Sequence, residues 1–277
     1  MFDFIAEPLG RILYFIYENI AFESYGLAII IFTVIIKIIL LPLSVKQQKS
    51  MSKIQKIQPQ IKEIQQKYKD DKEKLSQEMM KIYKENNANP ASGCLPLVIQ
   101  MPIIISLFYI LRRPLTFIIG MSKEKIFELA KDFELVQAGI GNYAELISKN
   151  MSAEVQIIKE SGEYLNMEFL NLNLGIQPSL TKIFSEPSTY VPLLILVILT
   201  VATMFLSSKI SMASKKQTEE TEEKGGMMAI QKNMIYLGPV MILFVAFRFP
   251  AGLSLYWLIS NAIQLLQNWY INKFVKE

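Results

Sequence analysis

The stretch FTVIIKIILLPL, from Phe32 to Leu43, reads as membrane-spanning apart from one residue, Lys37. A charged side chain near the centre of a bilayer costs roughly 2.5–3.5 kcal/mol on insertion scales. A cation at that depth has to be paired, wetted or deprotonated. The stretch therefore predicts a membrane helix, and it raises the question of what the cation faces.

The composition of the whole chain also favours a membrane protein. Of its 277 residues 51% are hydrophobic and 19% are charged, and the mean hydropathy is +0.28. This is more apolar than is usual for a soluble protein of this length. The chain has no histidine, and Cys94 is its one cysteine, so internal disulfides and thiolate metal clusters are excluded.

Several apolar runs approach the roughly 20 residues that a membrane crossing needs. We predict an all-α polytopic membrane protein with five transmembrane helices, at 25–45, 94–112, 190–208, 233–250 and 251–270. One buried helix of a soluble core could mimic such a run, but a series of them could not.

The charges of the connecting segments predict an orientation. Residues 46–93 carry 11 Lys against 6 acidic residues, whereas residues 112–189 carry 8 basic and 10 acidic residues. Because basic loops stay in the cytoplasm, we expect residues 46–93, the loop 209–232 and the short tail 271–277 there. The N-terminus and the segment 113–189 are then expected outside.

Two segments outside the spans have helical periodicity. Residues 1–24 lack the basic start of a signal peptide, and their apolar residues predict an amphipathic helix, either at the outer membrane interface or packed on the bundle. Residues 46–93 predict a cytoplasmic helical hairpin with Ile54, Ile57 and Met79 in its packing. This hairpin either connects two spans or acts as a docking arm for clients.

The loop 209–232 mixes charges with glycines and is expected to be flexible. The segment 113–189 contains amphipathic pieces and is expected to be folded or to lie on the membrane surface. The sequence assigns no chemistry to it.

Polar side chains recur along single faces of the predicted spans. The candidate groove residues come from the first, second and fifth spans: Lys37, Thr33, Gln100, Trp257, Asn261 and Gln264. Intramembrane polar groups avoid lipid, so these faces predict a shared hydrophilic chamber. Interhelical hydrogen bonding alone would explain the hydroxyl and amide groups, and snorkelling toward the cytoplasm would be enough for Lys37.

No catalytic constellation is present in the sequence. It lacks a G-x-S-x-G elbow, a P-loop and an H-E-x-x-H motif, and its spans hold no acidic residue. We therefore expect neither an enzyme nor a cofactor or metal site.

Three stretches resemble the YidC-type insertase family, also called YidC/Oxa/Alb. They are IIKIILLPLSVKQQKSM (Ile35–Met51), NPASGCLPLVIQMPIIISLFYILR (Asn89–Arg112) and FPAGLSLYWLISNAIQLLQNWYI (Phe249–Ile271). The resemblance covers most of the chain outside 113–189 and 212–230.

This resemblance implies a chaperone of the bacterial plasma membrane that inserts small membrane proteins without nucleotide or metal. It implies nascent membrane proteins as clients, with the Sec translocon, the ribosome and components of the signal-recognition-particle pathway as partners. It also implies a cytoplasm-facing groove with one positive residue, at the position of Lys37. No specific nucleic acid is expected to bind.

The chain departs from the family pattern in a few places. The family position matched by Lys37 is usually Arg, and lysine keeps the charge without the bidentate geometry. The lipoprotein signal of many five-span relatives and the long basic tail of some members are not seen. The alternative from another class is a transporter or channel that binds a small anion at Lys37.

Overall fold

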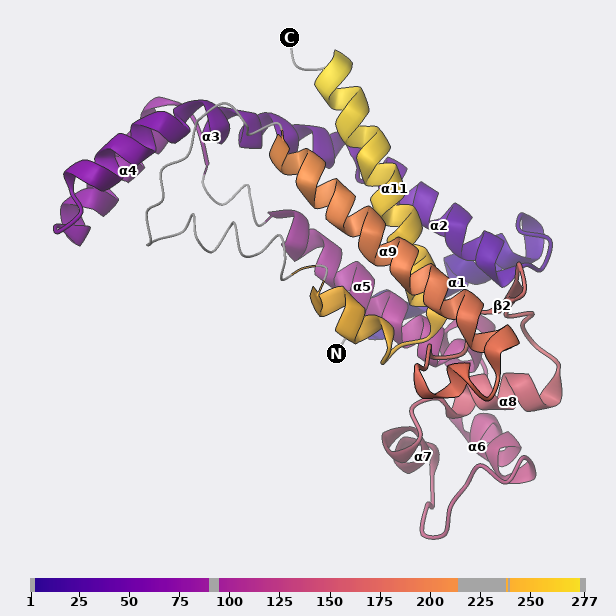
Figure 1. The fold of residues 1–277 in the computed structure, drawn as a ribbon. Helices are drawn as coiled ribbons and strands as arrows, with labels where there is room; N and C mark the ends of the chain where they lie inside the picture. The colour runs from indigo at the N-terminus through magenta and orange to yellow at the C-terminus, as the bar shows by residue number, and fades with distance from the viewer. Residues whose placement is uncertain (1–2, 90–94, 214–237, 239, 275–277) are drawn as a thin grey trace.

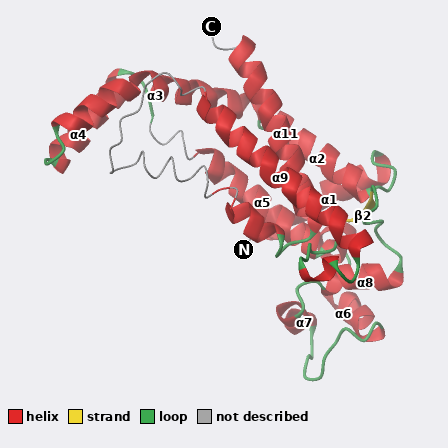
Figure 2. Ribbon diagram, viewed as in Figure 1, coloured by secondary structure: helices red, strands yellow, loops and turns green. Residues whose placement is uncertain are grey.

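The computed structural model describes residues 3–89, 95–213, 238 and 240–274, and this part of the chain is mostly helical (Figures 1 and 2). The long helices are α1 (Asp3–Asn19), α2 (Tyr25–Ile39), α3 (Leu41–Lys67), α4 (Lys72–Glu85), α5 (Leu95–Arg112), α9 (Pro187–Ala213) and α11 (Ala251–Phe274). The shorter elements are η2 (Leu115–Ile119), α6 (Lys123–Asp132), α7 (Tyr143–Lys149), α8 (Ala153–Ser161), β1 (Glu168–Phe169), β2 (Leu172–Asn173) and η3 (Thr181–Ile183).

The centre of the molecule is a helix bundle. Helix α11 packs against α9, α2 and α5, so it is in contact with three other long helices. One continuous hydrophobic core runs through it and includes the fully buried Phe32, Leu107 and Tyr256 from three different helices. These helices are long and largely apolar, so burying their facing sides against each other is the main favourable contribution to the bundle.

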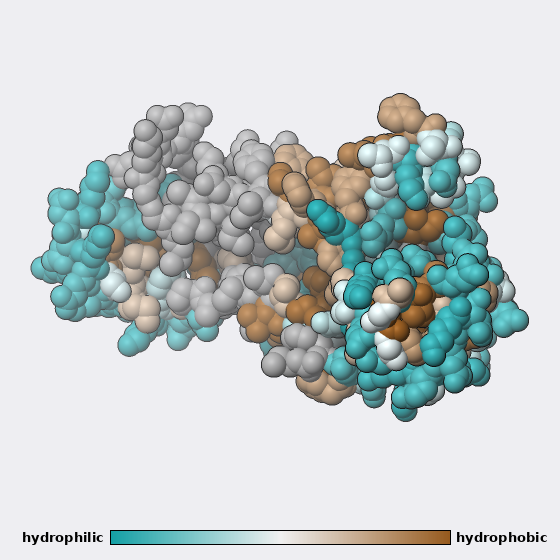
Figure 3. All heavy atoms as spheres, turned by 90° about the horizontal axis from the view of Figure 1, so that it is seen from below, coloured by the Kyte–Doolittle hydropathy of each residue, from teal (hydrophilic) through white to brown (hydrophobic). Residues whose placement is uncertain are grey.

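The apolar surface of the described residues fits a membrane. Helix α9 is long and apolar enough over Pro187–Ser208 to cross one, at roughly 33 Å for its 22 residues. Tyr25–Ile39 and Leu41–Ile54 pass the same test only as a bent pair, and Val98–Arg112 is a shorter apolar helix. Figure 3 shows hydrophobic atoms between two hydrophilic ends, one over α3 and α4 and the other over α6 to α8. The count of five spans stays a prediction, because the start of the expected fourth span and most of the loop 209–232 lie outside the described residues.

The expected first span, 25–45, is not one straight helix. Helix α2 ends at Ile39, α3 begins at Leu41, and the two meet at 56°. Pro42 lies in the first turn of α3 and has no N–H, so the carbonyl of Ile38 loses the donor that a continuous helix would supply. Proline is tolerated at the start of a helix, which is why the chain resumes its helix at once in a new direction.

Helices α3 and α4 form the hairpin that the periodicity predicts, and they extend away from the bundle (Figure 1). Ile57, Ile61 and Ile82 are buried in a small core of their own, with Ile54 and Met79 packed against it. The side chain of Asp71 accepts a hydrogen bond from the backbone N–H of Lys74 (3.0 Å) and so caps the start of α4. Pro59 lies inside α3, in the half of the helix that is further from the bundle.

Helix α1 packs on the bundle, against α5, α2 and η2. Its buried face includes Ala6, Gly10 and Leu13, and a Cβ atom at Gly10 would overlap the carbonyl of Phe117. Ile12, which the sequence places on the apolar stripe, is 45% exposed. Of the two alternatives for this helix, its contacts agree with packing on the bundle. Its placement at the outer membrane interface stays a prediction.

The segment between α5 and α9 is folded around a buried carboxylate. Glu154 of α8 is fully buried and accepts hydrogen bonds from the Thr116 N–H (2.9 Å), the Thr116 hydroxyl (2.6 Å) and the Tyr143 hydroxyl (2.7 Å). One side chain thereby joins η2, α7 and α8. Burial raises the pKa of Glu154 above the ordinary carboxyl value, since it disfavours the charged form.

The end of α5 is tied to the segment before α11. The Arg112 guanidinium packs against the rings of Phe108 (4.7 Å) and Phe249 (5.0 Å), which also contact each other edge to face, and it donates to the carbonyl of Arg248. The two ring contacts and the hydrogen bond fix where α11 begins relative to α5.

We predict that Ile61→Ala loosens the hairpin selectively. The substitution removes a side chain that is 2% exposed, and such losses cost about 2–5 kcal/mol. Hydrogen exchange should accelerate in α4 and in the outer part of α3, while exchange in α9 and α11 stays unchanged. Glu63→Ala, at an exposed position of the same helix, is the matched control, and equal exchange in the two variants would contradict the assignment.

We also predict that the α6 to α8 region becomes less stable as the pH rises. The folded chain holds the Glu154 proton more tightly than the unfolded chain, so stability falls between the ordinary carboxyl pKa of about 4.3 and the raised one. Glu154→Gln should remove this slope, measured as the pH dependence of hydrogen exchange in α7 and α8. Glu160→Gln, exposed on the same helix, should keep it, and a slope that survives in Glu154→Gln would assign it to another group.

Candidate functional site

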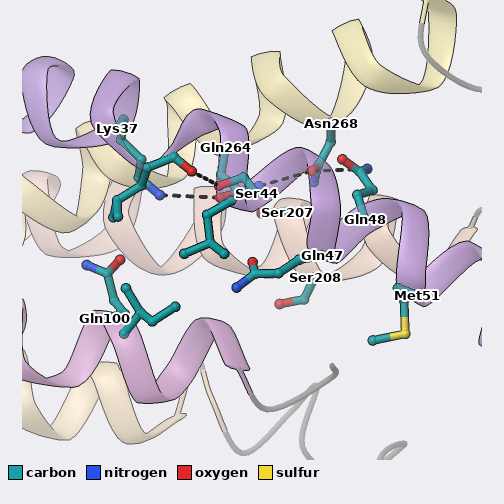
Figure 4. A pocket seen from close by; sticks show the side chains of 13 residues that line it. Lys37, Ser44, Gln47, Gln48, Met51, Gln100, Ser207, Ser208, Gln264 and Asn268 are labelled. Carbon is teal, nitrogen blue, oxygen red and sulfur yellow. Dashed lines mark hydrogen bonds between the residues drawn. The ribbon is translucent and has the colours of Figure 1, made fainter. Parts of the chain in front are cut away.

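A cavity of about 350 Å³ lies where α2, α3, α5, α9 and α11 meet (Figure 4). Its lining is mostly polar and carries one charged group. The lining residues are Lys37, Leu40, Leu43, Ser44, Gln47, Gln48, Met51, Ile99, Gln100, Ser207, Ser208, Gln264 and Asn268. The break between α2 and α3 contributes to this cavity, because it turns the first half of α3 across the end of the bundle, where residues of α3 join the lining.

Lys37 is half-buried, and its ammonium group points toward α11. It donates a hydrogen bond to the Gln264 side-chain oxygen (3.3 Å). No carboxylate is among the described residues that line the cavity. The positive charge is therefore held by a neutral amide and remains available to an anion that enters.

A chain of amide hydrogen bonds continues from this contact. The Gln264 amide nitrogen donates to the Asn268 side-chain oxygen (3.1 Å), and the Gln48 amide nitrogen donates to the same oxygen (3.4 Å). The Gln267 amide also donates to the backbone carbonyl of Lys37 (3.4 Å). Carbonyls in the last turn of a helix lack intrahelical donors, so the end of α2 at Ile39 is what makes this bond available.

The opposite wall comes from α5 and α9. The Gln100 amide donates to the hydroxyl of Tyr256, a fully buried residue of α11. This bond holds α5 against α11 and orients the Gln100 amide at the edge of the cavity. Ser207 and Ser208 add hydroxyl groups from the end of α9 (Figure 4).

The structure brings together three of the six residues predicted from the sequence. Lys37, Gln100 and Gln264 line the cavity. Thr33 and Trp257 are buried in the bundle away from the lining, and the Thr33 hydroxyl donates to the Ile29 carbonyl of its own helix (2.6 Å).

Asn261 also lies outside the lining. Its amide nitrogen is buried and makes no hydrogen bond within the described part of the chain. The fifth-span stripe is therefore divided: Gln264 and Asn268 reach the cavity, whereas Trp257 and Asn261 belong to the packed part of α11.

Sequence reasoning missed most of the contribution of α3. The sequence places Ser44 on the polar face of the first span, but Gln47, Gln48 and Met51, which follow it at steps of three and four residues, were not predicted to line the chamber. This signal is present in the sequence, but the residues fall at the boundary where a span was expected to end and a solvated hairpin to begin.

The chemistry of the cavity is that of binding. Among the residues that the structure describes, no group of His, Cys, Asp or Glu is arranged to hold a metal ion. The lining offers one cation and several amides and hydroxyls, which suit acidic or polar chain segments.

Comparison with known proteins shows which family this chain belongs to. Residues 15–277 match the family described as 60Kd inner membrane protein, which is almost the whole chain. The chain belongs to this family. It is a transmembrane protein of the bacterial plasma membrane.

Relatives in this family carry the name membrane protein insertase YidC. The protein of that name from Clostridium perfringens is 35% identical over 248 residues, covering 90% of this chain and 78% of the relative. The Fusobacterium nucleatum protein is 31% identical, covering 90% and 87%. Membrane protein insertase YidC 1 of Listeria monocytogenes is 33% identical, covering 90% and 64%. The resemblance noted in the sequence is thus confirmed.

We predict that a short thiol-reactive crosslinker joins α3 to α11 across the cavity. With the native cysteine replaced, Gln48→Cys combined with Asn268→Cys should crosslink efficiently, because the two native side chains are within hydrogen-bonding distance. Lys46→Cys with Asn268→Cys is the control, since Lys46 is exposed and does not line the cavity. Equal yields for both pairs, measured by mass spectrometry, would rule out this placement of α3.

Proposed function

We propose that this chain inserts client membrane proteins into the plasma membrane by receiving a polar client segment in the cavity around Lys37. Family membership supports insertion as the activity, and insertases of this family are not enzymes. The observation that carries the proposal is the Lys37 ammonium, which is bonded to the neutral Gln264 in a lining without carboxylates among the described residues.

An acidic side chain that enters the cavity would gain the most favourable electrostatic energy beside the Lys37 ammonium group. At about 4 Å from a unit positive charge, a carboxylate gains about 4 kcal/mol at an effective dielectric constant of about 20. The amides of Gln100 and Gln264 offer hydrogen bonds to the polar backbone of the same segment. Together they offset part of the cost of taking that segment out of water.

The client's apolar helix would then leave toward lipid, and its polar segment would cross. In this proposal Lys37, Gln100 and Gln264 contact the client. Thr33, Trp257 and Asn261 support the walls of the groove, because they do not reach the lining.

We assign the first contact with clients or delivery partners to the hairpin of α3 and α4. Its outer face is rich in Lys and Gln, and Met80 is 48% exposed there. Flexible methionine side chains adapt to varied apolar ligands. The proposal places this hairpin and the C-terminus in the cytoplasm and the N-terminus outside, with the Sec translocon, the ribosome and signal-recognition-particle components as partners.

The test is insertion of a single-span client with an acidic external tail into vesicles that contain this chain. Lys37→Arg should insert at the rate of the unaltered chain. Lys37→Ala should insert roughly tenfold more slowly, the equivalent of about 1.4 kcal/mol, and Lys37→Glu should abolish insertion by repelling the tail. Lys46→Ala removes the same charge at an exposed position that does not line the cavity, and it should have no effect.

Exchanging the residues at positions 37 and 264 tests whether the positive charge itself is needed for insertion, or only the lysine side chain of α2. Because the Lys37 nitrogen and the Gln264 oxygen are 3.3 Å apart, Lys37→Gln combined with Gln264→Lys puts the cation back in the same place from α11. This double variant should restore insertion. Equal insertion by all variants would refute the role of the charge. A chain that inserts no client but takes up small anions would support the transporter alternative.

A further inference from the structure

Two turns at one end of the bundle hold bulky apolar residues in left-handed backbone conformations. Phe22 has φ 51° in the turn before α2, and Leu170 has φ 51° at the tip of the β1–β2 hairpin. Glycine and asparagine occupy this region at much lower cost than a large side chain does. In a two-residue hairpin turn they are also the usual choice, yet the first position here is leucine.

Hydrogen bonds of the turn and of the hairpin hold these backbone conformations, but they do not cover the two side chains. The Phe22 side chain is 89% exposed and the Leu170 side chain is 80% exposed. A single exposed apolar residue needs no explanation. Two bulky apolar side chains held outward by turns that favour smaller residues indicate an apolar contact outside the chain.

The two turns are neighbours at the start of α2. The backbone N–H of Tyr25 donates to the carbonyl of Asn166, in the segment that leads into β1 (3.3 Å). The ring of Phe169 occupies the space where a Cβ atom at Gly26 would lie. The hairpin that carries Leu170 is therefore packed on the first turn of α2, close to Phe22.

A second pair of exposed apolar residues flanks η3, just before α9. Phe184 is 93% exposed and Leu180 is 58% exposed. Both η3 and β2 pack against α9, and Figure 1 shows the start of α9, the β2 hairpin and the turn before α2 at the same end of the bundle. We call Phe22, Leu170, Leu180 and Phe184 the tip residues.

The position of the tip residues points to lipid as the group that covers them. Helix α9 is the helix that is long and apolar enough to cross a bilayer, so its first turn marks one boundary of the hydrocarbon. Val191 and Ile195, one and two turns further along, are 38% and 52% exposed. Lys182 lies 5.6 Å from the centre of the Tyr190 ring at the same level, and aromatic and basic side chains gather at membrane interfaces.

We propose that the tip residues insert into the bilayer leaflet at this end of the molecule and fix the height of α2 and α9 in the membrane. The acyl chains supply the apolar contact that the exposed side chains lack. Because α2 runs directly from this anchor to Lys37, the same contact sets the depth of the cavity. This inference does not depend on which molecule enters the cavity.

Spin labels test the insertion directly. Labels at Phe22, Leu170 and Phe184, in a chain without other cysteines, are compared in vesicles of phosphatidylethanolamine and phosphatidylglycerol. Collisions with oxygen should exceed those with a water-soluble nickel chelate severalfold at all three sites, as at the lipid-facing Ile198. A label at the exposed Glu160 of α8 should show the reverse. The proposal would be overturned if the labels collided with the nickel chelate as often as the label at Glu160 does. It would also be overturned if neither reagent reached them, because a protein partner or a second copy would then cover them.

A pair of substitutions tests the native side chains. Phe22→Asn with Leu170→Asn suits the left-handed conformations, so the melting temperature in detergent should not fall. In vesicles, a label at Val191 should collide severalfold more often with the nickel chelate, because α9 loses its anchor. Phe184→Ser is a second variant at a residue with ordinary backbone angles, and it should shift the label in the same direction. An unchanged depth at Val191 in both variants would refute the anchoring role.

Discussion

The missing amide hydrogen of Pro42 governs the arrangement of the cavity. Because Pro42 cannot donate to the carbonyl of Ile38, that carbonyl accepts from a capping backbone N–H instead, α2 stops at Ile39 and α3 leaves at 56°. The turn brings the polar face of α3 across the end of the bundle, and it leaves the Lys37 carbonyl of α2 open to the amide of Gln267. Without the break, Ser44, Gln47 and Gln48 would continue along the axis of α2 and the cation would face fewer polar neighbours.

The cavity also shows how this chain keeps a lysine within an apolar helix bundle. A buried ammonium paired with a carboxylate would be neutralised, and one surrounded by apolar groups would be too costly. Here the partner is the amide of Gln264, itself held by Asn268 and through it by Gln48. Amides satisfy the donor geometry of the ammonium group and leave its charge in place.

Patterns within single helices were predictable from the sequence. The hairpin of α3 and α4 follows from the spacing of Ile57, Ile61 and Ile82, and the helical class follows from the apolar runs. Polar periodicity also indicated Lys37, Gln100 and Gln264. It could not separate Gln264, which reaches the cavity, from Asn261 one turn earlier, since that depends on how α11 is rotated against its neighbours. The contribution of α3 depends on the direction of the chain after Pro42, which no periodicity encodes.

Pro59 gives α3 a property that its unbroken appearance conceals. The start of this helix is hydrogen-bonded to α11 through Gln48 and Asn268, and further along it packs on α4 through Ile57 before the proline and Ile61 after it. Between them the proline removes one backbone hydrogen bond and crowds the preceding turn. Bending at the proline would pull Ile57 or Ile61 away from Ile82, so the hairpin core braces α3 where its own backbone is weakest. Helix α4 therefore keeps α3 straight in addition to pairing with it.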